Sequence, residues 1–248
     1  VYLTGTVSLK SDMTLYLAGG ALLKGSSDPK DFPADEGSGH WAHRAFVNIP
    51  RCRNVRIAGF GTIDANGTLI RNLQHGPHLM VIRDSENVVI EDIFVRDPAA
   101  WNTHPINCDA VTLRNIKMIN NRDVLNTDGF DISSSRNVTV EDCFAYTSDD
   151  AVVIKSYGDK EGRDITVRGN VILAKKSALK VGTETEADIT NVTFIDNDVV
   201  ECDRGMSLYV EDGARLSNVS YINNRFENFY PDARRRLLDF YIWNRNGG

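Results

Sequence analysis

The chain has 248 residues, 42% of them hydrophobic and 25% charged, with a formal net charge of −6 at pH 7. This length and composition are enough for a sizeable apolar core. The negative charge argues against nucleic acid as a partner, because phosphate binding needs a basic face. The basic run Arg234-Arg235-Arg236 is short, and we interpret it as a solvated loop. The sequence contains no transmembrane stretch or signal peptide, so we expect no membrane partner.

The chain opens on Val1 inside an apparent short strand. The stretch from Gly25 to Arg44 has no strand pattern and predicts a loop, and long loops in compact domains are often functional. From about residue 54 to residue 224 a pattern recurs: a small or polar residue, Val or Ile, any residue, and an apolar residue. Successive copies start 33, 23, 27, 27, 27 and 27 residues apart, a period typical of repeat architectures. The copies are 54–57, 87–90, 110–113, 137–140, 164–167, 191–194 and 218–221.

Each unit is rich in β-branched and aromatic residues that alternate with polar ones, which predicts short strands, and Gly, Asn, Asp and Ser fill the gaps as turn formers. About 27 residues suit one coil of three strands and three turns. We therefore predict an all-β chain, a right-handed parallel β-helix (a solenoid) forming one domain over residues 1–248. A leucine-rich repeat fold is not supported, because its sequence signature is absent. A propeller fits poorly, because its blades of about 40–45 residues are longer than the repeat of about 27 residues.

Both ends of the chain lack the polar cap that solenoids need, since an apolar run at 237–243 comes just before Gly248. We therefore expect a fragment or a trimmed chain. The four cysteines, Cys52, Cys108, Cys143 and Cys202, have no metal-ligand spacing, and packing in the core is their expected role.

Three carboxylates are the strongest functional signal. Asp128 precedes the adjacent pair Asp149-Asp150 by 21 and 22 residues, which is one repeat less a few positions. Stacked coils would bring the three acids to one surface patch. Crowded carboxylates raise each other's pKa, so such a cluster indicates acid/base chemistry or the binding of a cation.

Several motifs along the chain are typical of one known family. They are 2–11, 14–17, 20–21, Trp101-Asn102-Thr103-His104-Pro105 with Cys108, Asn126-Thr127-Asp128-Gly129-Phe130-Asp131, and Ser148-Asp149-Asp150-Ala151-Val152-Val153-Ile154-Lys155-Ser156. In these motifs the chain resembles the polygalacturonase-type glycoside hydrolases of family 28 over nearly its whole length, most specifically over residues 100–156. The resemblance implies a right-handed parallel β-helix that hydrolyses pectin-like polymers with inversion, needs no cofactor or metal, and works outside the cytoplasm, as a secreted, periplasmic or cell-surface protein. It implies Asp149 as the general acid, with Asp128 and Asp150 holding and activating the attacking water.

The adjacent acids Asp149 and Asp150 raise a geometric question. In a regular strand they would point to opposite faces, so a turn or bulge must break the alternation if both act. An inverting glycosidase of the usual kind also needs room for a water, with roughly 6.5–9.5 Å between its two carboxyl groups.

The sequence departs from the family pattern in two places. The family's Gly-His-Gly would fall within Lys175-Lys176-Ser177-Ala178, where no histidine occurs. Its Arg-Ile-Lys, which grips the uronate carboxylate, would fall on Ser207-Leu208-Tyr209. Loss of both cations argues against galacturonic acid in the central subsite. Lys155, Lys176 and Lys180 can replace them in part, which leaves an acidic polymer open.

Other polar and aromatic residues near these motifs are candidates for substrate binding. Tyr209 and Trp101 could stack on a sugar, although Trp101 could equally be a core ring. Asp131, Glu184, Glu211 and Asp212 are weaker candidates whose simplest roles are structural. The substrate-binding set is Asn126, Lys155, His104, Trp101, Lys176, Lys180 and Tyr209.

Three classes of function remain open. The first is an inverting glycoside hydrolase, expected to be a monomer, acting on a plant or microbial polysaccharide or oligosaccharide. The second is a β-helix polysaccharide lyase or epimerase, in which the three acids would hold calcium. The third is a carbohydrate-binding solenoid without turnover.

Overall fold

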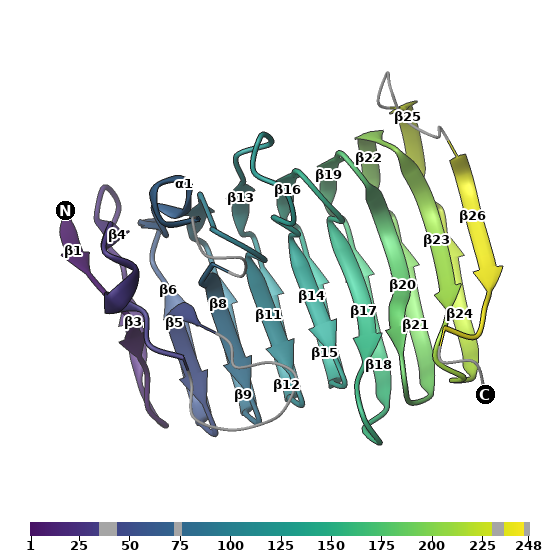
Figure 1. The fold of residues 1–248 in the computed structure, drawn as a ribbon, viewed down its shortest axis with the longest axis horizontal. Coiled ribbons are helices and arrows are strands. Elements are labelled where there is room, and N and C mark those ends of the chain that lie inside the picture. The colour runs from purple at the N-terminus through teal and green to yellow at the C-terminus, as the bar shows by residue number, and fades with distance from the viewer. Residues whose placement is uncertain (35–43, 72–75, 230–235, 246–248) are drawn as a thin grey trace.

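The computed structural model describes residues 1–34, 44–71, 76–229 and 236–245. Their strands form three sheets in which each coil of the chain contributes one strand to each sheet, and successive coils stack along one axis from the N-terminus to the C-terminus (Figure 1). Every pair of neighbouring named strands runs parallel. The predicted parallel β-helix is therefore confirmed, and a propeller is excluded.

We call the three sheets A, B and C. Sheet A consists of β1 (Tyr2–Thr4), β4 (Leu22–Gly25), β7 (Thr62–Asp64), β10 (Phe94–Arg96), β13 (Lys117–Ile119), β16 (Phe144–Thr147), β19 (Val171–Ala174), β22 (Asp198–Cys202) and β25 (Arg225–Phe229). Sheet B consists of β2 (Val7–Ser8), β5 (Ala45–Pro50), β8 (His78–Arg83), β11 (Thr103–Ile106), β14 (Phe130–Ser133), β17 (Val152–Ser156), β20 (Ser177–Thr185), β23 (Arg204–Val210) and β26 (Arg236–Ile242). Sheet C consists of β3 (Thr14–Tyr16), β6 (Arg53–Ala58), β9 (Glu86–Glu91), β12 (Asp109–Arg114), β15 (Arg136–Glu141), β18 (Gly162–Arg168), β21 (Ile189–Ile195) and β24 (Leu216–Ile222).

Sheet C carries the sequence repeat. The two apolar positions of one copy lie in register with those of the next, as with Val111 on Val138 and Leu113 on Val140. The first residue of each copy has a left-handed backbone, with φ between 53° and 56°. Asn and Asp tolerate that conformation better than other non-glycine residues, which explains why six of the seven copies begin with one of them.

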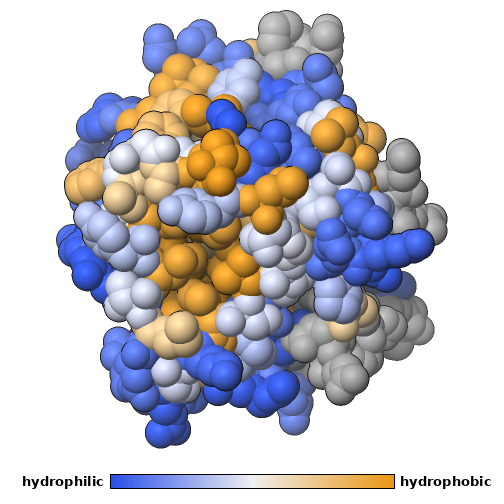
Figure 2. Space-filling view, turned by 90° about the vertical axis from the view of Figure 1, so that its left-hand side faces the viewer, coloured by the Kyte–Doolittle hydropathy of each residue, from blue (hydrophilic) through white to orange (hydrophobic). Residues whose placement is uncertain are grey.

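The core is a continuous apolar column inside the three sheets, and it includes the buried cysteines Cys52, Cys108, Cys143 and Cys202. At the N-terminal end, apolar side chains reach the surface (Figure 2). Tyr2, Leu3 and Tyr16 are exposed there, and Phe240 and Trp243 are exposed near the other end. Large apolar groups therefore lie open at both ends of the described stack.

The connections from sheet A to sheet B hold most of the irregular structure. From β7 to β23 they are residues 65–77, 97–102, 120–129, 148–151, 175–176 and 203, and the last three of these are the shortest. The first contains the short helix α1 (Gly67–Ile70). The predicted loop 25–44 also joins these sheets: its described part includes the 3-10 turn η1 (Pro29–Asp31), and residues 35–43 lie outside the described residues.

The basic run at 234–236 is only partly described. Arg234 and Arg235 lie outside the described residues, whereas Arg236 is the first residue of β26, so the interpretation as a loop is wrong for this residue. Among the helices that the structure describes, none has the length and apolar character needed to cross a membrane.

Candidate active site

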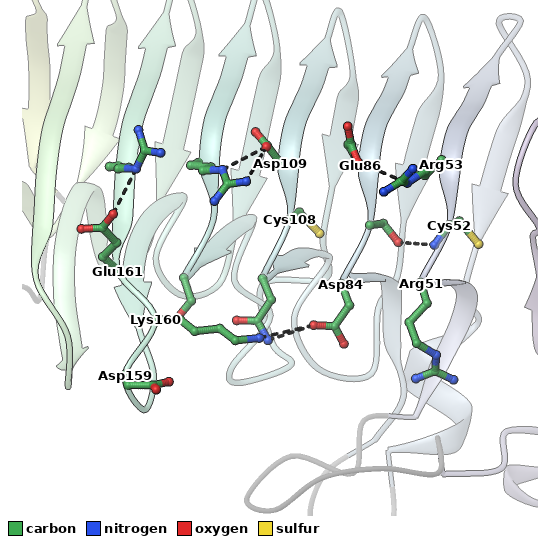
Figure 3. Close-up of a pocket in the computed structure, with 15 residues that line it drawn as sticks. Arg51, Cys52, Arg53, Asp84, Glu86, Cys108, Asp109, Asp159, Lys160 and Glu161 are labelled. Atoms are coloured by element: carbon green, nitrogen blue, oxygen red, sulfur yellow. Dashed lines mark hydrogen bonds and ion pairs between the residues drawn. The ribbon is translucent and has the colours of Figure 1, made fainter.

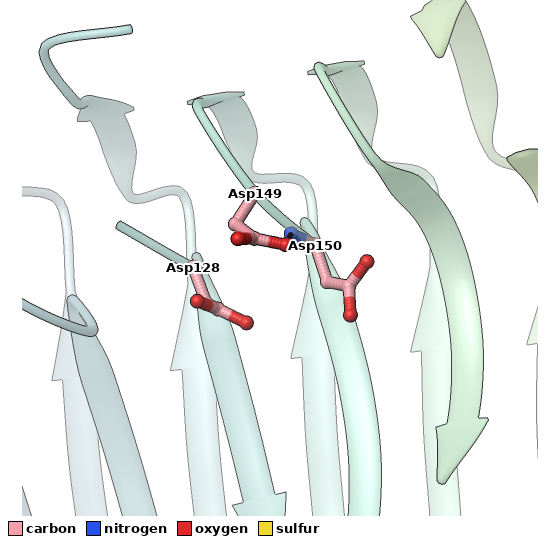
Figure 4. A group of neighbouring side chains, drawn as sticks. All are labelled: Asp128, Asp149 and Asp150. Carbon is pink, nitrogen blue, oxygen red and sulfur yellow. Dashed lines mark hydrogen bonds between the residues drawn. The ribbon is translucent and has the colours of Figure 1, made fainter. Parts of the chain in front are cut away.

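The three predicted acids meet at the edge between sheets A and B. Asp128 ends the connection into β14, and Asp149 and Asp150 lie in the connection into β17 of the next coil (Figure 4). Each offers an oxygen that lies within 4.8 Å of those of the other two. The register explains the convergence: Phe130 pairs with Val152, so this coil advances by the same 22 residues that separate Asp128 from Asp150.

A turn separates the roles of the adjacent acids. β16 ends at Thr147 and β17 begins at Val152, so Asp149 and Asp150 lie between strands rather than within one. The Thr147 hydroxyl donates to the Asp149 carbonyl at 2.8 Å, and the Asp150 amide donates to the Asp149 carboxylate at 3.1 Å. The predicted break in alternation is present, and it lets Asp149 stay half-buried while Asp150 is buried.

Buried polar side chains hold these turns. Asn102 donates from its amide to Asn120 Oδ1 at 2.7 Å, and Asn120 donates to the carbonyls of Thr127 and Asp128 at 2.8 and 3.2 Å. The hydroxyls of Thr127 and Ser148 lie 2.7 Å apart and tie the two acid-bearing coils together. The residues beside the acids in the sequence motifs therefore act as scaffolding.

The spacing of the acids suits a shared water. Two hydrogen bonds of about 2.8 Å meeting at one water span about 4.6 Å between their acceptors. The separation within 4.8 Å matches that span. It is shorter than the roughly 6.5–9.5 Å expected between carboxyl groups of an inverting pair, although that figure describes whole carboxyl groups and not their nearest oxygens.

Asp150 is the acid with the strongest counter-charges. Lys180 Nζ donates to Asp150 Oδ2 at 2.7 Å, and the Ser177 amide donates to Oδ1 at 2.8 Å. Arg204 NH2 lies 3.8 Å from the same carboxylate. Burial opposes ionisation, but the charges of Lys180 and Arg204 outweigh it and lower the pKa of Asp150 to about 2. Asp150 is therefore a carboxylate at any ordinary pH.

The other two acids are shifted the opposite way. Burial raises the pKa of Asp128 well above its usual value, and the nearby charges of Asp131 and Asp149 raise it further. Burial and the Asp150 charge raise the pKa of Asp149. One ionised carboxylate thus lies beside two carboxyls that favour the protonated form, which is the division of states that acid/base catalysis uses.

A second charged cluster lies under Asp128 on the outer face of sheet B. Lys155 Nζ lies 3.1 Å from Asp131 Oδ1, 3.3 Å from Glu184 Oε2 and 3.8 Å from the ring centroid of Trp101. Burial raises the pKa of Asp131 to about 7 despite Lys155. The weaker candidates Asp131 and Glu184 therefore hold Lys155, which points away from open solvent.

The remaining predicted binding residues differ in how they are placed. Trp101 is half-buried between His78 and His104, and His104 is fully buried with Nε2 3.0 Å from the Ser133 hydroxyl. Asn126 is exposed on the connection that carries Asp128, and Lys176 is exposed on the connection one coil beyond the one that carries Asp149 and Asp150.

Tyr209 lies one coil beyond Lys180 and is almost fully buried. It donates from its hydroxyl to Asp239 at 2.5 Å, and its ring lies 4.3 Å from that of Tyr241. The weaker candidates Glu211 and Asp212 both lie near Arg245, at 3.8 and 2.6 Å.

Arg204 was missed by the sequence reasoning, although a signal was present. Asp150, Ser177 and Arg204 are spaced by 27 residues, which is the repeat period, so they occupy one position on three successive coils. Following the repeat forward from each acid would have found it.

A separate groove of about 600 Å³ runs along the edge between sheets B and C, where Arg53, Asp109 and Lys160 are among its lining residues (Figure 3). Its charges pair with one another: Arg53 lies 3.2 Å from Glu86, and Arg136 lies 2.8 Å from Asp109. The groove contains none of the three acids, and its charges are largely neutralised from within. We therefore assign the chemistry to the acids and not to this groove.

Comparison with known proteins shows a family match over most of the chain. Residues 2–231 match the model of the glycosyl hydrolases family 28. A probable polygalacturonase of Vitis vinifera is 27% identical over 84% of this chain and 47% of its own length. An endo-polygalacturonase of Pectobacterium carotovorum subsp. carotovorum is 27% identical over 88% of this chain and 62% of its own length. The chain thus spans about half to three fifths of these relatives.

Solved structures show the same fold. The family 28 exopolygalacturonase of Yersinia enterocolitica superposes with a TM-score of 0.79 at 22% identity, covering 99% of this chain and 59% of that one. A hyperthermoactive exopolygalacturonase of Thermotoga maritima superposes with a TM-score of 0.80 at 22% identity, covering 98% of this chain and 66% of that one. At this identity the likeness establishes the parallel β-helix alone.

Proposed function

Because the chain belongs to glycoside hydrolase family 28, we propose that it hydrolyses glycosidic bonds of a pectin-like polysaccharide with inversion. The observation that carries the proposal is that neighbouring carboxyl groups at the site favour opposite protonation states. Asp150 has a pKa of about 2, whereas burial and neighbouring charge raise the pKa of Asp149. An inverting hydrolase needs one carboxyl of each kind.

Asp149 is the proton donor in this proposal. It is the half-buried member of the trio, so its carboxyl can reach the glycosidic oxygen of a bound chain. A proton donor must still hold its proton when substrate binds, and the raised pKa of Asp149 favours that state. The leaving sugar takes the Asp149 proton as the bond breaks.

Asp150 and Asp128 hold the attacking water. The ionised Asp150 accepts a hydrogen bond from the water and takes its proton as the oxygen attacks. Asp128 Oδ1 is buried and has no hydrogen-bond partner among the described residues, so it can bind the same water. The Lys180 ammonium stays on Asp150 throughout and keeps it in place.

We infer the substrate class and the compartment from the family. Relatives named as polygalacturonases support a galacturonate-containing or related polymer, while the missing Arg-Ile-Lys pattern at residues 207–209 argues for a central subsite that differs from theirs. Such polymers lie outside the cytoplasm, so the protein acts as a secreted, periplasmic or cell-surface enzyme.

A lyase or epimerase that holds calcium on the three acids is the second candidate, because their oxygens lie within 4.8 Å of one another. The fixed charges of Lys180 and Arg204 weigh against it. A divalent ion bound to Asp150 would be repelled by an ammonium 2.7 Å from the same carboxylate.

Hydrolysis of a polysaccharide panel tests the proposal. New reducing ends are scored for the wild type, for Asp149→Asn, and for the matched control Asp159→Asn in an exposed turn on the opposite edge. Each is run with and without EDTA, and absorbance is followed for unsaturated products. Loss of a general acid removes about 10²–10⁴-fold of the rate.

The expected result is chelator-insensitive hydrolysis by the wild type and by Asp159→Asn, with little or none by Asp149→Asn. An unsaturated product that disappears with EDTA would establish the lyase instead. Glycan binding without release of any product would favour the binding solenoid.

A further inference from the structure

One position on the outer face of sheet B lacks a cation that the family pattern has there, and a lysine lies beside that position. The resemblance places the family's arginine at residue 207, which is serine here. The register pairs Ser207 with Lys180 on the preceding coil. Neighbouring strands lie about 4.8 Å apart, so Lys180 offers a cation on the strand next to residue 207.

Ser207 and Lys180 are both buried, and each already has a partner within the protein. Ser207 is fully buried, and its hydroxyl donates to the Ser177 hydroxyl at 3.2 Å. The Lys180 side chain is 8% exposed and its partner Asp150 is 5% exposed, with 2.7 Å between Nζ and Oδ2. Substrate could reach the Lys180 ammonium only after this buried ion pair broke, which would leave Asp150 unpaired.

We propose that Lys180 is the positioning residue of Asp150, and that it acts by holding this carboxylate against the water rather than by gripping the sugar. The inference rests on the proposed function of the site, and it replaces the expectation that Lys180 binds substrate. The Ser177 amide fixes the second oxygen of Asp150 at 2.8 Å, so the carboxylate is held at both ends.

Arg204 gives the arrangement its second cation. Its NH2 group lies 3.8 Å from Asp150, while NH1 donates to the Tyr209 hydroxyl at 3.3 Å. Tyr209 in turn donates to Asp239, so Arg204 is anchored from the side away from the acids. Arg204 thus stabilises the Asp150 carboxylate from 3.8 Å, while Lys180 makes the direct hydrogen bond.

The experiment removes the positive charge at residue 180, restores it as arginine, or places it at residue 207. Steady-state kinetics are measured for Lys180→Met, Lys180→Arg and the double variant Lys180→Ser/Ser207→Arg, with Lys160→Met in an exposed turn as the matched control. We expect Lys180→Met to lose about 100-fold or more in kcat with KM changed less than about threefold. Lys180→Arg should recover about tenfold or more of that loss, because it restores a cation beside Asp150. The double variant should recover less, because residue 207 lies one coil farther from Asp150 than residue 180 does.

The opposite division overturns the proposal: if Lys180→Met raises KM and leaves kcat intact, Lys180 grips the sugar. Failure of Lys180→Arg to recover any of the lost kcat would also refute the proposal, because a cation at residue 180 would then have no effect through Asp150.

Thermal unfolding gives a readout that does not depend on turnover. Removing one partner of a buried ion pair leaves the other charge buried and unpaired. Lys180→Met should therefore lower Tm by about 5 °C or more. Adding Asp150→Asn to that variant should restore part of the loss. A double variant less stable than Lys180→Met would contradict the pairing, whatever the enzyme hydrolyses. A wild type that hydrolyses nothing would instead refute the proposed function.

Discussion

Lys155 and Asp131 form an ion pair of 3.1 Å in which the side chains are 6% and 0% exposed. The pair lies on the outer face of sheet B, beneath the acids. Glu184 on the next coil lies 3.3 Å from the same ammonium, and Arg245 lies 3.7 Å from Glu184. Charges of alternating sign therefore run along the stack from beneath Asp128 toward the C-terminal coil.

Replacing Lys155 by Met should destabilise the protein more than replacing an exposed lysine. The change leaves Asp131 and Glu184 without their shared cation, and breaking a buried pair costs about 3–5 kcal/mol. Asp131 can escape part of that cost by protonating, so the loss of stability should be greater at pH 8 than at pH 5. Urea unfolding at both pH values measures the difference, and an equal loss at the two would contradict it.

The Asp131→Asn variant should flatten the dependence of stability on pH. The pKa of Asp131 is about 7 in the fold against an ordinary value of 3.8 for Asp, so between these values the folded chain binds more protons than the unfolded chain. Stability contributed by this group is present below about pH 4 and is lost as pH rises toward 7. Tm of the wild type should fall over that range, and Tm of Asp131→Asn should fall less.

Asp150 should act on stability in the reverse sense. Its pKa is lowered from 3.8 to about 2, so its contribution is present above pH 4 and is lost as pH falls toward 2. A scan of Tm from pH 2 to pH 4 on the wild type and Asp150→Asn separates this contribution, and a wild-type curve parallel to that of the variant would argue against the shift.

Activity should have an acidic optimum. The proposed active form has Asp150 ionised and Asp149 protonated. The rate constant kcat/KM should therefore stay high down to about pH 3, since the pKa of Asp150 is about 2, and fall at higher pH as Asp149 loses its proton. The profile of kcat/KM against pH tests this. An optimum above neutrality would reject these roles.

The first product should carry the inverted anomeric configuration. In the proposed mechanism, a water held by Asp128 and Asp150 attacks from the face opposite the leaving group, without a covalent intermediate. Proton NMR of the anomeric signals during the first minutes of hydrolysis detects the product before it equilibrates. Retention would point to a carboxylate acting as a nucleophile.

The Asn120→Ala variant should lose both stability and turnover. Its amide donates to the carbonyls of Thr127 and Asp128 and accepts from Asn102, so the change leaves buried polar groups without partners. Each such group costs about 1–3 kcal/mol. Chemical denaturation and kcat on the same preparation measure both effects. Unchanged kcat despite lower stability would mean that the scaffold does not set the position of Asp128.

The fold could be predicted from the repeat because residues one period apart in the apolar pattern are the residues that pair between neighbouring strands of sheet C. Val138 follows Val111 by 27 residues and pairs with it. The convergence of Asp128 and Asp150 was also predictable, since their spacing equals the advance of one coil.

The partners of the acids were harder to predict from sequence. Lys180 donates to Asp150 across 30 residues, which is not a multiple of the repeat, because a lysine side chain reaches diagonally to the neighbouring coil. The direction of a long side chain depends on the charges around it, and these come from other coils. The expectation that Arg236 lay in a loop failed because the three arginines were interpreted as a charge run and not as the start of a strand.

The acids come from two adjacent coils in the middle of the stack, and this makes the reaction centre modular. Its geometry depends on the hydrogen-bonded spacing of neighbouring strands and on the short connection at 148–151. In a solenoid each coil contacts only its neighbours. Evolution can therefore lengthen, shorten or decorate the remaining coils, and so change how many sugars the surface meets, without rebuilding the chemistry.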